Sequence, residues 1–282
     1  MTGAVDGTLT GAGGVSLFWR RLAPDGTPRG VVVVVHGYAE HLERYADLFA
    51  HLVARGLAVA AVDLRGHGRS GGPRGHCGHA DELVADVDAL VRATGAVWPD
   101  VPRLLFAHSM GGLVALRYLV RHPTGVRAAA LSAPALRVPD AGSPVVRRVA
   151  RALGRLAPQL SFTTRLDADG LSRDPAVGPA YVADPLVHRR ASAGLVRAIE
   201  DAQAAAFADA ASVAVPLLVL QGDADRLVDP AAAGELAARL TCPHELVMLP
   251  GYYHELLNEP KPAAARVLEL LDAWFDRWLG AA

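Results

Sequence analysis

Short apolar runs along the chain alternate with stretches in which apolar residues recur every three to four positions. Residues 31–35 are an unbroken run of valine, as expected for a central strand that is buried on both faces. Residues 80–97 predict a helix, because Leu83, Val87 and Leu90 share one face. By the same criteria, strands are predicted over 57–64, 103–107, 126–132, 217–221 and 245–249, and helices over 43–55, 110–121, 191–211, 230–240 and 262–279.

This alternation predicts an α/β protein. Strands separated by helices join through right-handed crossovers, so the central sheet should be mostly parallel and flanked by helices. Residues 134–190 interrupt the pattern, with no strong strand and an amphipathic stretch at 144–156. The interruption is too long for a plain loop. We therefore expect residues 134–190 to form an inserted helical cap over one end of the sheet, and residues 1–133 and 191–282 to form the core of a single structural domain.

Composition limits the function classes. The 282 residues are 51% hydrophobic, enough for one large core, and the net charge of −1 provides no field that would recruit nucleic acid. Residues 1–14 lack a charged start followed by an apolar run, and no apolar stretch approaches the ~20 residues that span a bilayer. A cytoplasmic protein is expected. Cys77 and Cys242 match neither a disulfide framework nor a zinc site, so they are predicted to be free thiols.

Residues 106–112, Phe-Ala-His-Ser-Met-Gly-Gly, lie where a predicted strand ends and a predicted helix begins. A serine on such a tight turn, here Ser109, is lifted clear of the backbone beside the free N–H groups of the helix N-terminus. Gly111 and Gly112 let the helix pass close to the neighbouring strand. Ala107 stands where the usual Gly-x-Ser-x-Gly pattern has glycine. The motif predicts a nucleophile; the alternative is a buried serine at a structural turn.

His36-Gly37-Tyr38 follows the valine run. A loop at this place can supply the Tyr38 backbone N–H as one oxyanion donor, and Met110, next to the serine, can supply a second. Two preorganised donors stabilise a tetrahedral oxyanion by several kcal/mol, roughly 10²–10³ in rate per donor. The alternative is that His-Gly merely turns the chain.

The acid of a triad should follow a late strand. Two aspartates compete after the strand predicted at 217–221. Asp223 lies directly at the turn and can cap it through its own backbone, whereas Asp225 is far enough along to reach a histidine. Asp225 is therefore the favoured acid.

The base is predicted to be His254, in the Gly-containing loop after the last strand. His244 fits less well because it precedes that strand, and three further histidines lie in an early loop: His67, His76 and His79. The order serine, aspartate, histidine along the chain is a known order of a Ser-His-Asp triad.

The segment 63–71, Asp-Leu-Arg-Gly-His-Gly-Arg-Ser-Gly, is rich in glycine. It lacks the Gly-x-Gly-x-x-Gly and Gly-Lys-Ser/Thr arrangements of phosphate-binding loops. We expect a structural loop in which aspartate and arginine pair.

Taken together, these blocks resemble the monoacylglycerol lipase family, also called lysophospholipase-like hydrolases, of the α/β-hydrolase fold. The similarity runs from about Val15 to Leu279. It rests on His36-Gly37-Tyr38-Ala39-Glu40-His41 with Arg44-Tyr45, on Asp63 to Ser70, on His108 to Gly112, on Leu171 to Pro175, on Asp184-Pro185-Leu186, on Leu220 to Asp225 and on Tyr253-His254.

The resemblance implies that Asp225, the last residue of its Gly-x-x-Asp block, is the acid. It places Glu40 and Arg44 either near a glycerol head group or in support of the oxyanion loop. Some members bind glycerol with a polar residue shortly after the histidine, where this chain has leucine. The resemblance also implies a cap that shapes an acyl tunnel and touches lipid, here through the stripe in 144–156.

The expected activity is hydrolysis of carboxylic esters, monoacylglycerols or similar short- and medium-chain acyl esters, through an acyl-enzyme on Ser109. The expected partner is a small-molecule ester, with no metal, no organic cofactor and no nucleic acid. The alternatives are another acyl substrate for the same triad (thioester, aminoacyl amide or acyl transfer) and a non-catalytic ligand receptor.

Overall fold

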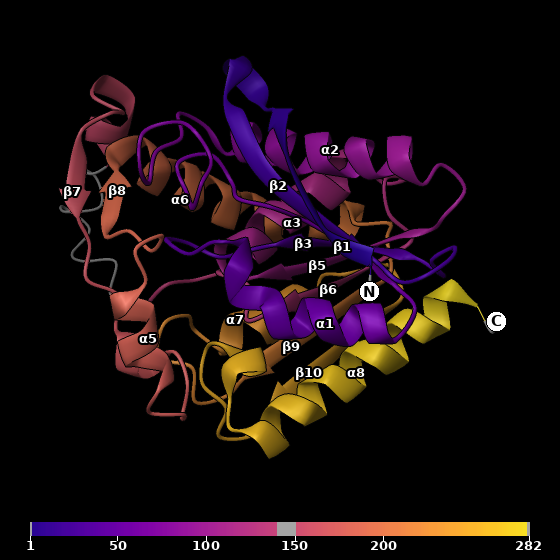
Figure 1. Cartoon of the computed structure of the whole chain (residues 1–282). Coiled ribbons are helices and arrows are strands. Elements are labelled where there is room, and N and C mark those ends of the chain that lie inside the picture. Colours follow the sequence, from indigo (N-terminus) through magenta and orange to yellow (C-terminus); the bar gives the residue numbers. More distant parts are fainter. Residues whose placement is uncertain (1, 140–150, 281–282) are drawn as a thin grey trace.

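The core of the protein is an eight-stranded sheet in the order β1-β2-β4-β3-β5-β6-β9-β10 (Figure 1). The computed structural model describes residues 2–139 and 151–280. Six neighbouring strands run parallel, as predicted, and β1 and β2 form an antiparallel hairpin at one edge. The strands are β1 (Thr2–Thr10), β2 (Ser16–Ala23), β3 (Val31–Val35), β4 (Ala58–Val62), β5 (Arg103–His108), β6 (Ala128–Ser132), β9 (Leu217–Gly222) and β10 (His244–Leu249).

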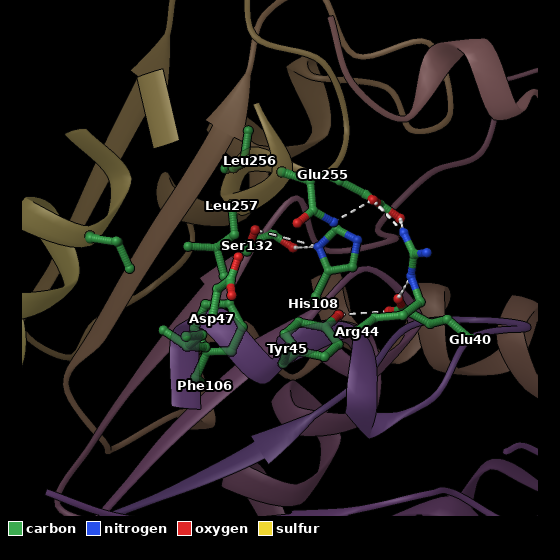
Figure 2. Close-up of a pocket in the computed structure, with 13 residues that line it drawn as sticks. Glu40, Arg44, Tyr45, Asp47, Phe106, His108, Ser132, Glu255, Leu256 and Leu257 are labelled. Atoms are coloured by element: carbon green, nitrogen blue, oxygen red, sulfur yellow. Dashed lines mark hydrogen bonds and ion pairs between the residues drawn. The ribbon is translucent and has the colours of Figure 1, made fainter. Parts of the chain in front are cut away.

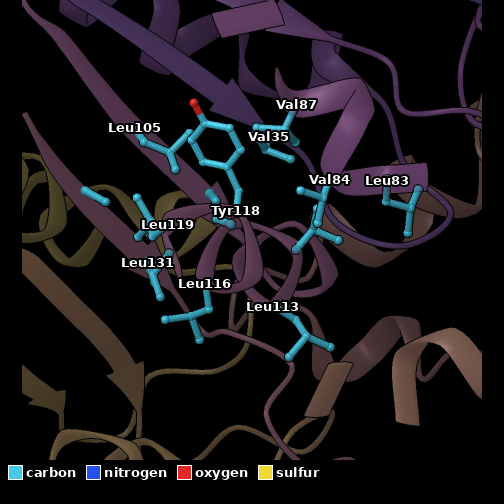
Figure 3. Close-up of a cluster of buried hydrophobic side chains, with 14 of the residues drawn as sticks. Val35, Leu83, Val84, Val87, Leu105, Leu113, Leu116, Tyr118, Leu119 and Leu131 are labelled. Carbon is cyan, nitrogen blue, oxygen red and sulfur yellow. The ribbon is translucent and has the colours of Figure 1, made fainter. Parts of the chain in front are cut away.

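Helices cover both faces of the sheet (Figure 1). One face packs against α2 (Ala80–Val97), α3 (Met110–Arg121), α6 (Ala193–Ala208) and α7 (Ala231–Ala237), and the other against α1 (Ala46–Ala54) and α8 (Lys261–Leu279). Successive valines of β3 alternate between these two clusters, because side chains of a strand point to opposite faces. Figure 3 shows Tyr118 and three leucines of α3 between α2 and the strands.

The predicted elements agree with this arrangement except at a few ends. The helices predicted over 80–97 and 110–121 match α2 and α3 residue for residue. The helix predicted from residue 191 begins only at Ala193, because Arg190–Ser192 forms the strand β8. A 3₁₀ turn, η2 (Leu42–Tyr45), occupies the first turn of the helix predicted at 43–55. The β1–β2 hairpin was not predicted.

The predicted cap is not purely helical. Its described part contains a helical turn at 151–156, β7 (Ser161–Thr163), η3 (Ala168–Gly170) and α5 (Val177–Ala183), and β7 pairs antiparallel with β8. Of the apolar stripe predicted in 144–156, Val145, Val146 and Val149 fall outside the described residues. Leu153 is 37% exposed and Leu156 is 85% exposed.

Two other expectations concern the whole chain. Cys77 and Cys242 are both free, as predicted, and the structure places both in the interior. Within residues 2–139 and 151–280, no helix has the length and apolar character needed to cross a membrane.

Candidate active site

Ser109 lies at the junction of β5 and α3, in a backbone conformation that few residues adopt. Its φ is 52°, and among the described non-glycine residues only Ala39 and Ala133 share a positive φ. Such a conformation costs about 1–3 kcal/mol and clusters at functional sites. The surroundings fix it, since Ser109 N–H donates to the Ser132 carbonyl at 3.0 Å. At Gly111 an added Cβ would collide with the backbone of β3, so this glycine allows the close approach.

Ser109 and the predicted base and acid form one chain of hydrogen bonds. His254 Nε2 lies 2.9 Å from Ser109 Oγ, and His254 Nδ1 lies 2.7 Å from Asp225 Oδ2. His254 is 3% exposed and Asp225 is 8% exposed. The second oxygen of Asp225 accepts the backbone N–H groups of Leu227 at 2.8 Å and Val228 at 3.1 Å.

These hydrogen bonds keep the acid ionised. Burial raises the pKa of Asp225, but the bond from His254 and the two backbone N–H groups outweigh burial and leave the pKa below its usual value. An ionised carboxylate beside Nδ1 selects the tautomer that carries its proton there and leaves the Nε2 lone pair facing the serine hydroxyl.

Asp223, the competing aspartate, has a different partner. It is exposed, and its Oδ1 accepts the N–H of Gly251 at 2.5 Å. The expectation that it caps its own turn was wrong, because its side chain reaches the loop after β10. Among the described histidines, His254 alone is hydrogen-bonded to Ser109. His244 instead contacts the Cys242 carbonyl.

The two predicted oxyanion donors line the same pocket as Ser109. Within the described residues, the backbone N–H groups of Tyr38 and Met110 have no hydrogen-bond partner. The preceding turn is fixed by His36, which accepts from the Leu64 N–H at 2.9 Å and donates to the Gly37 carbonyl at 2.7 Å. Two unpaired donors beside a serine hydroxyl are what an oxyanion hole needs.

The pocket over Ser109 has a volume of about 1040 Å³ including its mouth. Part of its wall comes from the predicted cap, including Val138, Leu171 and Tyr181. Tyr181 is 5% exposed, and its hydroxyl has no partner among the described residues. Sequence reasoning did not single out this tyrosine, because only the folded chain brings α5 over the serine.

A smaller pocket of about 510 Å³ (Figure 2) shares Glu40, His108 and Glu255 with the pocket over Ser109. His108 Nδ1 donates to the Ser132 carbonyl at 3.0 Å. Burial and the neighbouring His254 lower the pKa of His108 to about 4. His108 is therefore neutral and adds no charge beside the triad. The described residues contain no group of three or more side chains suited to a metal ion.

The loop at 63–71 is structural, but its pairing differs from the prediction. Asp63 is buried and accepts the backbone N–H groups of Leu42 at 2.8 Å and Arg69 at 2.7 Å. Arg65 pairs with Asp86 of α2 instead of with Asp63. The loop therefore braces the start of η2 and the first half of α2.

Comparisons with known proteins agree with the geometry. The family described as Serine aminopeptidase, S33, matches residues 26–261. The monoacylglycerol lipase of Mycolicibacterium smegmatis is 42% identical over 269 residues, which cover 95% of this chain and 95% of that protein. The monoglyceride lipase of Mus musculus is 33% identical over 278 residues, covering 97% of this chain and 91% of that protein. The chain belongs to the monoacylglycerol lipase family.

Solved structures confirm the α/β-hydrolase fold of this family. A monoacylglycerol lipase of Paleococcus ferrophilus superposes with a TM-score of 0.83 at 33% identity, covering 92% of this chain and 97% of that chain. A soluble variant of the monoglyceride lipase of Saccharomyces cerevisiae superposes with a TM-score of 0.89 over 100% of this chain and 97% of that chain; at 20% identity it compares the fold alone. As a member of the monoacylglycerol lipase family, the chain is a carboxylic ester hydrolase.

The resemblance to monoacylglycerol lipases left two roles open for Glu40 and Arg44: contact with a glycerol head group, or support of the loop that follows β3. The structure shows contacts in which both residues hold that loop (Figure 2). Glu40 accepts the Gly37 N–H at 2.5 Å and the Tyr45 hydroxyl at 2.6 Å. Arg44 donates to Glu40 at 3.1 Å and to both oxygens of Glu255 at 2.7 and 2.8 Å. Arg44 thus joins the predicted oxyanion loop, residues 36–41, to the residue that follows His254.

Glu255 was not predicted to have a role, although its place next to His254 was the available signal. Burial raises the pKa of Glu255. Burial also acts to raise the pKa of Glu40, but Arg44 and the Tyr45 hydroxyl hold it well below its usual value. In this member of the monoacylglycerol lipase family, one arginine therefore compensates two buried carboxylates.

Proposed function

We propose that the protein hydrolyses monoacylglycerols or similar short- and medium-chain acyl esters through Ser109, His254 and Asp225. The observation that carries the proposal is the unbroken hydrogen-bond chain from Ser109 Oγ to His254 (2.9 Å) and from His254 to Asp225 (2.7 Å) at the floor of an apolar pocket. Membership of the monoacylglycerol lipase family supports the ester as substrate class.

In the proposed mechanism His254 Nε2 accepts the hydroxyl proton while Ser109 Oγ attacks the ester carbonyl. The N–H groups of Tyr38 and Met110 donate to the oxyanion that forms. Collapse of this intermediate expels the alcohol, which takes the proton from His254 and leaves an acyl group on Ser109. A water then gives its proton to His254 and attacks the acyl carbon, which frees the acid and restores the serine. All of these groups belong to the chain, and the mechanism uses no metal or cofactor.

Residues 134–190 are proposed to be the cap that shapes this pocket, since Val138, Leu171 and Tyr181 form part of its wall. The unpartnered Tyr181 hydroxyl is a proposed donor to the alcohol part of the substrate. Apolar side chains are also exposed on the outside of the cap: Leu153, Leu156, Leu160, Phe162 and Val182. We propose that this surface makes transient contact with lipid while the protein is cytoplasmic.

The test is Ser109→Ala. Loss of the nucleophile should reduce hydrolysis of p-nitrophenyl butyrate and of a 1-monoacylglycerol to background, while circular dichroism and melting temperature remain those of the wild type. Ser212→Ala is the matched control, because Ser212 is exposed on a 3₁₀ turn. Wild-type turnover by Ser109→Ala would reject the assignment.

A second candidate uses the same triad on another acyl substrate. It is favoured by the family description, which names an aminopeptidase, and by a relative called phospholipase YtpA from Bacillus subtilis, 31% identical over 240 residues. A panel of monoacylglycerols, lysophospholipids and aminoacyl amides separates these activities. A kcat/KM for an amide or a lysophospholipid above that for every monoacylglycerol would replace the first proposal by the second.

A further inference from the structure

The loop with the predicted oxyanion donor is tied to the cap by the side chain of the same residue. The Tyr38 hydroxyl donates to the Arg190 carbonyl at 2.9 Å and lies 2.9 Å from the Thr164 hydroxyl. Arg190 begins β8 and Thr164 directly follows β7, so one phenol holds both strands of the small sheet of the cap. Displacement of this sheet would therefore move the residue whose backbone N–H is proposed to donate to the oxyanion.

Two further contacts attach the cap to the same loop. The His188 N–H donates to the carbonyl of Ala39, which has a φ of 66° and sits next to Tyr38. His41 Nε2 lies 2.8 Å from Asp184 Oδ2. Residues 184–190, called the strap below, thus bind the oxyanion loop at both ends.

Between these ends, the imidazole of His188 in the strap packs against the imidazole of His67 in the loop at 63–71. The rings of His67 and His188 are 4.7 Å apart at 53°, and Tyr38 packs edge-on against His188 with a centroid distance of 5.7 Å. His67 Nδ1 donates to the Arg65 carbonyl, and His188 Nδ1 accepts the Arg190 N–H. The Nε2 atoms of both rings are buried and have no partner among the described residues.

Protonation of either ring would break this arrangement. On His67 it would add a buried N–H without an acceptor. On His188 it would place a proton on Nδ1, opposite the Arg190 N–H that Nδ1 accepts in the neutral form. A buried donor or charge without a partner costs several times more than an exposed one.

The groups around the pair do not compensate a positive charge. The titratable and charged residues that contact the pair or act on it from the core are His36, Tyr38 and Arg74. Those of the cap that line the pockets beside His188 are Arg165, Tyr181, Arg189 and Arg190. Burial, followed by Arg74, lowers the pKa of His188 to about 4, and burial with His36 and His188 holds the pKa of His67 well below its usual value. Asp63 and Glu40 act on His36, one ring further inward.

We propose, as an addition that rests on the proposed hydrolase function, that Tyr38 and His188 are positioning residues for the oxyanion hole and that acid releases them by protonating the His67–His188 pair. At neutral pH both rings are uncharged, the strap is bound and the Tyr38 N–H is held in place. A fall in pH shifts the strap toward separation from the loop.

Proton linkage gives the direction and the size of the effect of pH on opening of the strap. When the strap opens, His188 faces water and regains an ordinary pKa of about 6.5, so the open form binds more protons than the closed form. A fall in pH therefore favours opening, by up to tenfold per pH unit for this histidine. With a closed-form pKa of about 4, the opening constant rises about thirty-fold between pH 8 and pH 5.

Hydrogen exchange of the wild-type protein tests the release. The amides of Thr164, His188 and Ser192 donate to Arg189, Ala39 and Gly75 across the strap and its surroundings. After correction for intrinsic exchange, their protection should fall about thirty-fold from pH 8 to pH 5. His188→Phe keeps an aromatic ring but removes the titrating group, so its fall should be more than threefold smaller. His122→Gln, at a half-exposed histidine of the core surface, should behave as the wild type.

Kinetics at pH 8 test the positioning. Tyr38→Phe keeps the ring and the backbone N–H but loses both hydroxyl contacts, so kcat for a soluble ester should fall about fivefold while KM stays within twofold. Tyr118→Phe, in α3 away from the pocket, should leave both unchanged.

The outcomes distinguish failure of the proposed hydrolase function from failure of the proposal for Tyr38 and His188. A folded wild type without ester hydrolysis at pH 8 would overturn the proposed function. Wild-type hydrolysis together with unchanged kcat in Tyr38→Phe would overturn the positioning role. Equal protection at pH 8 and pH 5, or equal falls in wild type and His188→Phe, would overturn the release by acid.

Discussion

Arg44 offers the sharpest test of how the site is supported. It makes its hydrogen bonds to Glu40 and Glu255, whose side chains are 5% and 6% exposed. Arg44→Met keeps much of the volume but leaves two buried carboxylates without their cation. Removing one partner of a buried ion pair costs about 3–5 kcal/mol, because the remaining charge is uncompensated.

This loss should depend on pH. Arg44 lowers the pKa of both Glu40 and Glu255, so its removal raises the folded-state pKa of Glu40 and raises further that of Glu255, which already lies above its usual value. A raised folded-state pKa gives stability that is present at low pH and lost as pH rises through it. The deficit should therefore be largest near pH 8 and shrink in acid by up to about 1.4 kcal/mol per pH unit for each carboxylate, within the window between its folded-state pKa values in the wild type and in the variant.

Urea denaturation at pH 8 and pH 5.5, together with kcat/KM on a soluble ester, measures both effects. Arg266→Met is the matched control, because Arg266 pairs with Glu269 on the exposed face of α8 and should cost less than about 1 kcal/mol. A free energy of unfolding for Arg44→Met within 1 kcal/mol of the wild type at pH 8 would refute the supporting role. A raised KM at unchanged stability would instead favour direct contact with substrate.

Two other substitutions test the acid and the cap. Asp225→Asn should lower kcat by about 10⁴, the loss typical of a triad whose histidine takes the wrong tautomer. Asp223→Asn should leave kcat within a few-fold of the wild type. Comparable losses of kcat for the two variants in stopped-flow and steady-state assays would contradict the assignment of the acid. Leu156→Asp should weaken turnover of monoacylglycerol in vesicles several-fold and leave p-nitrophenyl butyrate hydrolysis unchanged, since Leu156 is 85% exposed. Equal binding of wild type and variant to vesicles in a flotation assay would contradict the lipid-contact proposal.

Much of the fold was predictable because its signals are local. The valine run of β3 needs only its own composition to predict a strand buried on both faces, and the periodicity of α2 and α3 gave their limits. The turn around Ser109 could be predicted from six neighbouring residues. Three candidates far apart in the chain, Ser109, Asp225 and His254, could be proposed because each follows a parallel strand, and the carboxyl ends of parallel strands meet at one edge of the sheet.

The strands that were not predicted depend on pairing with other segments, which a local sequence pattern does not contain. The β1–β2 hairpin carries little apolar periodicity, so its pairing with β4 decides its structure. Residues 190–192 have no strand signal of their own and become β8 only because β7 lies beside them.

The sequence by itself thus determined the α/β class, the order of the elements and the three side chains proposed for catalysis. Only the tertiary structure decided which charges meet: Arg44 bridges to Glu255 across 211 positions, Asp223 binds Gly251, and His188 packs on His67. The physical reason is that periodicity reports which face of an element is buried, whereas a hydrogen bond or ion pair requires atoms within about 3 Å. That distance is set by how the whole chain packs.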